Sequence, residues 1–339
     1  MSTSPSLPVT VRRKIPLELR LWWEDLEKSE QGKIKLHLGG LTSLLKVRPR
    51  CDIIKALVTF WDPAHNVFRF SDFELTPTVE EVAGYMDVTE GLRHKYLIAP
   101  RAVNSHKFMD LLKISKGVPY TELDRGFSTL QFTYHRYGHI GGFNDPESGV
   151  CNRGNLEKWS EHRRFAFMVA FLGIVVFPRK DRNIDLKVAG IVKVLITNDK
   201  SIFAPMIVSE IYRALTACKA GADFFEGCNL LLQMWMIEHL CRHPQCMRYM
   251  STNEDCIEGY NLRVSGLRLP EGFEEWISYL RAITAKQINW TLSWLPVEEI
   301  VYMPATGPHF LLIGLRGIQP YAPYRVMRQL GRCQVVHPD

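Results

Sequence analysis

The sequence predicts a mainly α protein: a single helical domain with a small β-hairpin near residues 67–76 and short strands near residues 300–313. Three observations support this fold class. Apolar residues recur at spacings of three and four along most of the 339 residues. The segment VFRFSDFELTPTVEEVAGYM at 67–86 changes from alternating apolar residues to a helical spacing. The apolar run FAFMVAFLGIVVF at 165–177 has the character of a central buried helix.

The first half of the segment 67–86 predicts the hairpin. Phe68 and Phe70 share one face of an extended stretch, and Phe73 and Leu75 share a face of the next. The polar pair Ser71-Asp72 between them is short enough to form a turn. We expect the three phenylalanines to be largely buried, and Phe70→Ala to cost about 3–5 kcal/mol, as for other buried aromatic residues.

The second half of this segment predicts a capped helix. Thr76-Pro77-Thr78 supplies a hydroxyl N-cap and a proline suited to a first turn, and Glu80 and Glu81 follow where a helix N-terminus favours negative charge. Because these two glutamates are adjacent and point in different directions on a helix, capping explains them better than paired acid/base catalysis. The helix should bury one apolar stripe, formed by Val79, Val82, Ala83 and Met86.

The same periodicity predicts the other helices. They are expected at about residues 16–29, 51–61, 106–114, 156–176, 186–196, 205–218, 230–240, 273–280 and 323–330. The segment LLLQMWMIEHL at 230–240 is apolar nearly all round and should be interior. The region 116–154, rich in glycine and aromatic residues, is expected to wrap the core as loops.

No linker rich in proline, glycine and serine separates these elements. We therefore predict a flexible N-terminus at 1–15, an N-terminal helix at 16–35 and one continuous domain over 36–338. The N-terminal residues contain no apolar secretory segment, and the apolar run at 165–177 has 13 residues, whereas a membrane helix needs about 20. An intracellular protein without a membrane partner is expected.

The charge pattern permits nucleic-acid contact without predicting a specific site. The formal net charge is +6, and basic residues cluster only in short runs, Arg12-Arg13-Lys14, Arg93-His94-Lys95 and Arg179-Lys180. Such runs offer few phosphate contacts, so any nucleic-acid binding should be weak and sensitive to salt.

Two groups of soft ligands suggest metal sites, and neither has a standard spacing. The segment EHLCRHPQC contains His239, Cys241, His243 and Cys246. A proline interrupts this group, so a helix end with incidental soft residues is the better interpretation. His135 and His139 are four residues apart, but the glycines around His139 disfavour the continuous helix that a metal pair would need. No metal is predicted.

The sequence lacks the common catalytic motifs. It contains no G-x-S-x-G, H-E-x-x-H, P-loop or G-x-G-x-x-G segment. We predict no catalytic residue and no cofactor-binding residue, and therefore a protein that is not an enzyme.

Three blocks resemble the plant mobile domain, a family found in plant transposable elements and in host proteins of the MAINTENANCE OF MERISTEMS type. They are FWDPAHNVFRFSDFELTPTVEEVAGYM at 60–86, EGCNLLLQMWMIEHL at 226–240 and YRVMRQLGRCQ at 324–334. Leu330 stands where the family pattern has an aromatic residue, and Met86-Asp87-Val88 replaces a more usual Leu-Gly-Leu. The family is also labelled "aminotransferase-like", but no stretch here combines the lysine, pyridinium partner and phosphate cup that pyridoxal phosphate requires.

This resemblance implies a non-catalytic nuclear protein-interaction module that acts in transposon silencing, genome maintenance or meristem development. A PP7-type phosphatase is the kind of protein partner that the family suggests. The alternative is an accessory protein encoded by a transposable element, with weak nucleic-acid binding.

The C-terminal block supplies the candidate partner-binding residues. Arg325, Arg328 and Arg332 recur at i, i+3 and i+7, which places them near one flank of a helix. Planar guanidinium groups bind carboxylates through two hydrogen bonds, so these arginines could pair with a partner. They could equally cap carbonyl groups or pair within this chain.

Overall fold

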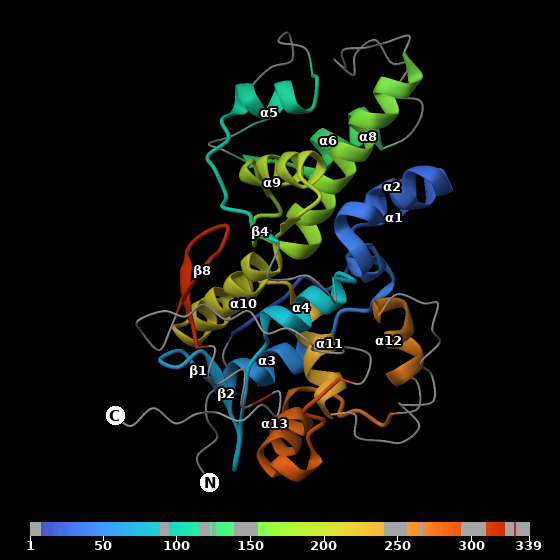
Figure 1. Ribbon diagram of the computed structural model, residues 1–339. Coiled ribbons are helices and arrows are strands. Elements are labelled where there is room, and N and C mark those ends of the chain that lie inside the picture. Colours follow the sequence, from blue (N-terminus) through green and yellow to red (C-terminus); the bar gives the residue numbers. More distant parts are fainter. Residues whose placement is uncertain are drawn as a thin grey trace. The chain divides into compact units, whose positions relative to one another are not determined.

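The structure is a computed structural model, and Figure 1 shows it as a ribbon. It describes residues 8–88, 95–114, 123, 127–138, 155–240, 256–264, 267–292, 310–322 and 329. The chain divides into two compact units: unit 1 comprises residues 1–13, 46–95 and 204–339, and unit 2 comprises residues 14–45 and 96–203. The fold is mainly α with a few short strands, as predicted. The single domain over 36–338 stays a prediction.

Unit 1 contains seven described helices and five described strands, from segments that lie far apart in the sequence. Its helices are α3 (Cys51–Phe60), α4 (Val79–Tyr85), α10 (Ala204–Lys219), α11 (Asn229–Leu240), α12 (Cys256–Val264), α13 (Phe273–Ala282) and the short 3-10 helix η7 (Ala285–Gln287). Its strands are β1 (Trp61–Asp62), β2 (Val67–Arg69), β3 (Glu74–Leu75), β8 (Phe310–Ile313) and β9 (Ile318–Tyr321). The helix α11 is buried along nearly its whole length, as its apolar sequence predicts.

The predicted hairpin forms and gains a third strand. β2 pairs antiparallel with β3, placing Phe68 opposite Leu75, and β1 pairs with the other edge of β2. Phe68 and Phe73 are buried. Phe70 is less buried than Phe68: its side chain is half-buried and stacks between Phe60 and Phe73. The expected cost of Phe70→Ala therefore falls below that of a fully buried aromatic residue.

An ionic cluster fixes the β8–β9 hairpin to α10. Arg316, in the turn between the strands, donates from its backbone N–H to Glu210 Oε1 at 2.7 Å and from Nε to Oε2 at 2.8 Å. The same guanidinium reaches Glu226 at 3.0 Å. Gly314 is required beside this cluster, because a Cβ there would lie 2.8 Å from Glu210 Oε1. These contacts explain how two short strands hold a defined position on a helix.

Unit 2 is built around α8 (Leu156–Phe171), which continues as the π-helix η5 (Leu172–Val176). The other helices are α1 (Leu17–Asp25), α2 (Lys28–Leu38), the 3-10 helix η1 (Gly39–Lys46), α5 (Ser105–Leu111), α6 (Leu130–Tyr137) and α9 (Lys187–Thr197). Its strands form two-residue pairs, β4 (Tyr96–Leu97) with β7 (Ser201–Ile202) and β5 (Phe127–Ser128) with β6 (Ile184–Asp185).

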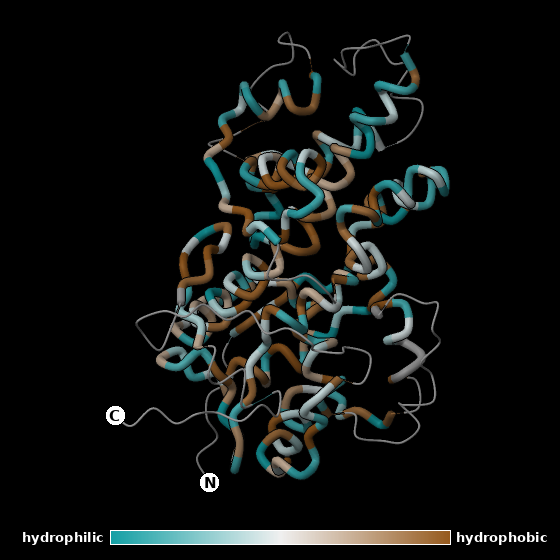
Figure 2. The backbone as a smooth tube through the Cα atoms, in the orientation of Figure 1, coloured by the Kyte–Doolittle hydropathy of each residue, from teal (hydrophilic) through white to brown (hydrophobic). Residues whose placement is uncertain are grey.

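The helix α8 changes character along its length. Its first turns are polar and its last turns apolar, which Figure 2 shows as a change from teal and white to brown. The apolar end is fully buried: Phe167 packs edge-on against Trp22 of α1, with ring centroids 5.5 Å apart. Gly173 allows the close approach of β6, since a Cβ there would lie 2.5 Å from Ile184 Cγ2. The charged side chains of α8 are thus confined to its polar turns, which end at Arg164.

Two predicted segments differ in the structure. The predicted helix at 16–35 is divided, because Leu26 and Glu27 are extended and Glu27 forms a capping box with Glu30 that starts α2. The region predicted to form loops contains α6, whose N-terminus is capped when the N–H of Phe132 donates to Thr129 Oγ1. None of the described helices combines the length and apolar content needed to cross a bilayer.

Candidate partner-binding site

The three arginines proposed from the sequence, Arg325, Arg328 and Arg332, lie outside the described residues. Gln329, from the same block, is described and is buried. Its amide accepts from the backbone N–H of Thr76 and donates to the Thr76 carbonyl oxygen, both at 2.9 Å. This pair of bonds anchors Gln329 at the junction between the hairpin and α4.

Four buried side chains of unit 1 form a closed hydrogen-bonded group, the sealed cluster (Thr78, Glu81, Trp235 and His239). Glu81 Oε2 accepts from the backbone N–H and hydroxyl of Thr78 and from Trp235 Nε1, each at 2.9 Å. Glu81 Oε1 lies 2.9 Å from His239 Nε2. The predicted capping by Thr78 and Glu81 is confirmed. The capping carboxylate also binds α4 to α11.

The hydrogen bonds of the sealed cluster favour an ion pair. His239 Nδ1 lies 2.6 Å from the carbonyl oxygen of Asn289, which can only accept, while Nε2 faces the carboxylate of Glu81. Burial by itself lowers the pKa of His239, but the charge of Glu81, the hydrogen bonds with Glu81 and the Asn289 backbone, and the charge of Glu238 together outweigh it, and the net pKa is raised. Burial by itself raises the pKa of Glu81. The charge of His239 and the hydrogen bonds that Glu81 accepts outweigh this effect, so the net pKa of Glu81 lies below its ordinary value.

The surroundings of the sealed cluster are also closed. Tyr85 donates to Glu238, and Tyr321 Oη donates to Glu80 at 3.2 Å. Burial raises the pKa of Tyr321 well above its ordinary value, so this hydroxyl stays protonated. Glu81 is 1% exposed and His239 is 0% exposed. A reactant from solvent cannot reach these groups, so the arrangement acts to hold α4, α11 and β9 together.

His239 was one of four zinc-ligand candidates in the sequence, and the structure commits both of its ring nitrogens to other partners. Cys241, His243 and Cys246 lie outside the described residues. His135 lies on α6. His139 lies outside the described residues. Within the described ranges, no three His, Cys, Asp or Glu side chains are arranged to hold a metal ion.

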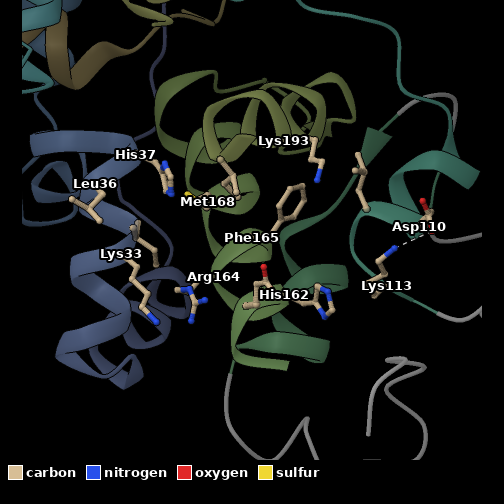
Figure 3. A pocket seen from close by; sticks show the side chains of 14 residues that line it. Lys33, Leu36, His37, Asp110, Lys113, His162, Arg164, Phe165, Met168 and Lys193 are labelled. Atoms are coloured by element: carbon tan, nitrogen blue, oxygen red, sulfur yellow. Dashed lines mark hydrogen bonds and ion pairs between the residues drawn. The ribbon is translucent and has the colours of Figure 1, made fainter. Parts of the chain in front are cut away.

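Unit 2 contains a concave surface site with a volume of about 500 Å³, the basic hollow. Figure 3 shows Phe165 and Met168 of α8 at its floor, with Lys33, His37 and Arg164 on one side and Asp110 and Lys113 on the other. Lys193 of α9 lies above the floor. The full lining consists of Lys33, Ile34, Leu36, His37, Asp110, Leu111, Lys113, Glu161, His162, Arg164, Phe165, Met168, Lys193 and Ile196.

The lining of the basic hollow carries four cationic side chains against two carboxylates. One carboxylate is already paired, since Asp110 lies 3.3 Å from Lys113 Nζ. Arg164 Nη1 lies 3.8 Å from Oε1 of the buried Glu30. Lys33 and Lys193 are exposed and form no ion pair with a described residue. These two lysines are the cations most available to a ligand.

Two histidines of the basic hollow have lowered pKa values, in both cases mainly because they are partly buried. Burial lowers the pKa of His37, and the charge of Arg164 lowers it further against a hydrogen bond with the Leu195 backbone. Burial also lowers the pKa of His162; Glu161 opposes this shift, and Lys113 and Lys158 add to it. His162 Nδ1 is buried without a hydrogen-bond partner in the structure. The preference of the site for an anionic ligand comes from the excess of cationic side chains in its lining.

The basic hollow has no direct signal in the sequence. Its residues come from four segments, at 33–37, 110–113, 161–168 and 193–196, and none of them is a recognised motif. The middle of α8, where its polar turns give way to apolar ones, carries Glu161, Arg164, Phe165 and Met168 at spacings of three, one and three. That spacing places them on one helix face, and it is the signal from which the floor could have been proposed.

Comparison with known proteins gives one match. No curated protein matches the chain. No solved structure matches it. A family model described as a domain of unknown function, DUF7745, matches residues 19–339, which is most of the chain. The chain belongs to the DUF7745 family.

Proposed function

We propose that this protein is a non-catalytic protein-interaction module. The observation that carries the proposal is the basic hollow, a concave surface that offers cationic and apolar contacts. Charge complementarity and apolar contact are what a protein interface requires. The Glu/His pair that most resembles catalytic machinery is instead sealed inside unit 1.

The cellular setting is proposed from the three sequence blocks that resemble the plant mobile domain. On that basis the protein acts in the plant nucleus, in transposon silencing, genome maintenance or meristem development. A PP7-type phosphatase is the partner class that the resemblance suggests. No cofactor and no catalytic residue take part in this proposal.

A second candidate is an accessory protein encoded by a transposable element, with weak nucleic-acid binding. The exposed Lys33 and Lys193, which form no ion pair with a described residue, favour it. Such binding would be electrostatic and would weaken steeply as salt is added.

Affinity purification from plant nuclei, with and without nuclease, tests the two functions. The interaction module predicts a reproducible set of proteins that survives nuclease treatment. The accessory protein predicts that co-purifying material is lost when nucleic acid is digested. Recovery of no specific protein under either condition would contradict the interaction module.

A further inference from the structure

We propose that the basic hollow binds an acidic segment of a partner protein, in which carboxylates flank an apolar side chain. This inference rests on the proposed interaction function and names the chemistry of the partner. It concerns residues of α2, α5, α8 and α9, all within unit 2.

The cations are placed to bind carboxylates at separate points. Lys33 comes from α2, Arg164 from α8 and Lys193 from α9, and Figure 3 shows them around the apolar floor. A single small anion could contact only part of such a ring. A peptide with carboxylates on both sides of an anchor residue could contact cations on different helices at once.

Apolar side chains form the rest of the lining of the basic hollow. Leu36 is 83% exposed and Ile196 is 38% exposed, and both line the hollow together with the floor residues Phe165 and Met168. Exposed aliphatic side chains beside a concave apolar floor are typical of sites that receive an anchor residue. The volume of about 500 Å³ lies within the range of about 300–1,000 Å³ usual for ligand pockets.

A nucleic acid fits this site less well. Single strands bind where aromatic rings offer a face for base stacking. The floor ring, Phe165, is only 7% exposed, so its face is not available. The carboxylates of Asp110 and Glu161 interrupt the cationic lining. A peptide can place its separated carboxylates away from them, whereas a continuous phosphate backbone passing through the hollow cannot avoid them.

The first test is binding of a defined probe to the purified full chain. The probe is a fluorescent peptide with aspartates and glutamates on both sides of two leucines, measured by anisotropy. Lys33→Glu combined with Lys193→Glu should weaken binding by about tenfold or more, because two attractive contacts become repulsive.

A matched variant separates the site from overall charge. Arg281 and Lys286, in unit 1, are exposed and form no ion pair with a described residue. Arg281→Glu with Lys286→Glu changes the net charge by the same amount and should leave peptide affinity near that of the unchanged chain. Equal losses of peptide affinity in the two double variants would overturn the proposal, since they would indicate only non-specific electrostatic attraction between the chain and the peptide.

The apolar contact has its own test. Replacing the probe's leucines with serine should weaken binding, and Leu36→Ser should reduce the preference for the leucine peptide. A photoreactive leucine in the probe should cross-link to peptides from 28–38, 156–171 or 187–197, identified by mass spectrometry. Cross-links confined to unit 1 would contradict the site.

The alternatives give distinct results. Tighter binding of a single-stranded oligonucleotide than of the peptide, lost in the Lys33/Lys193 variant, would assign the hollow to nucleic acid instead. Peptide binding that inorganic phosphate abolishes, with no effect of the leucines, would assign it to a simple anion.

Partner recovery from nuclei tests the proposed function, whereas peptide binding to the variants tests the basic hollow, so the two proposals can fail separately. Nuclease-resistant partners that bind the Lys33/Lys193 variant as well as the unchanged chain would leave the interaction function standing and exclude the hollow. Peptide binding at the hollow without any specific nuclear partner would support this site and count against the proposed function.

Discussion

The sealed cluster of unit 1 and the basic hollow of unit 2 use the same residue types in opposite ways. In the sealed cluster, His239 and Glu81 satisfy each other and all their remaining hydrogen-bonding positions within the chain. In the basic hollow, His162 keeps a buried nitrogen without a partner, and Lys33 and Lys193 face solvent. The difference teaches that internal satisfaction marks a structural group, whereas surplus charge at a concave surface marks a candidate binding group.

Two adjacent arginines repeat this contrast within α8. Arg163 is buried, donates from Nε to the Tyr137 carbonyl oxygen at 3.0 Å and pairs with Asp25 at 2.5 Å. Arg164 lines the basic hollow, and its only ionic partner among the described residues is Glu30, at 3.8 Å. A shift of one residue along the helix therefore separates a structural arginine from one available to a ligand.

The largest effect is expected from breaking the sealed cluster. Glu81→Ala should lower the free energy of unfolding by about 3–5 kcal/mol, because it leaves the buried His239 without its counter-ion. Urea denaturation measures this loss. Glu161→Ala, at an exposed carboxylate of the same type, is the control and should change stability by less than about 0.5 kcal/mol. Similar effects of both substitutions would refute the assignment of a structural role to Glu81.

A smaller effect is expected from the paired arginines. Arg163→Ala should cost about 2–3 kcal/mol, because it removes several charged hydrogen bonds from a buried position. Arg164→Ala should cost less than about 1 kcal/mol, since its ionic contact is long. Thermal unfolding of the two variants side by side provides the comparison. A larger loss for Arg164→Ala would reverse the roles given to them.

The sealed cluster should also make stability depend on pH. The raised pKa of His239 means that its contribution is complete below its ordinary value of 6.5 and is lost as the pH rises through the folded-state pKa. The lowered pKa of Glu81 means that its contribution is present above 4.5 and is lost as the pH falls through its folded-state pKa. The pair therefore stabilises most between these two pH values.

His239→Gln tests this dependence. The charged neighbours that face His239 are Glu81 from α4 and Glu238 on its own helix, and both favour the imidazolium. The difference in melting temperature between the unchanged chain and the variant should be largest in the mildly acidic window and should shrink toward alkaline pH. A difference that is constant with pH would show that His239 is neutral in the folded state.

The smallest effect on stability is expected at the basic hollow. Lys33→Glu with Lys193→Glu should change the melting temperature little, because both side chains are exposed and form no ion pair with a described residue. Differential scanning fluorimetry checks this at low and physiological salt. A marked destabilisation would mean that these lysines support the fold, and the contrast between the two sites would then fail.

Much of the fold could be predicted from the sequence because local periodicity and capping decide it. The predicted helices near α3, α8, α9, α10, α11 and α13 are present, and Thr78 caps α4 as expected. Those features depend on residues close together in the chain. The incomplete burial of Phe70 could not be predicted, because alternation identifies a shared face of a strand, whereas burial depends on what covers that face.

The sequence by itself determined the mainly α class, the hairpin and the capping glutamate, since each follows from neighbouring residues. Only the tertiary structure decided which charged groups are internal and which are available. His239 meets Glu81 across 158 residues of chain, and the basic hollow gathers four separate segments. Contacts over such separations leave no periodic trace in the sequence, because they depend on how packed helices place their faces rather than on local propensity.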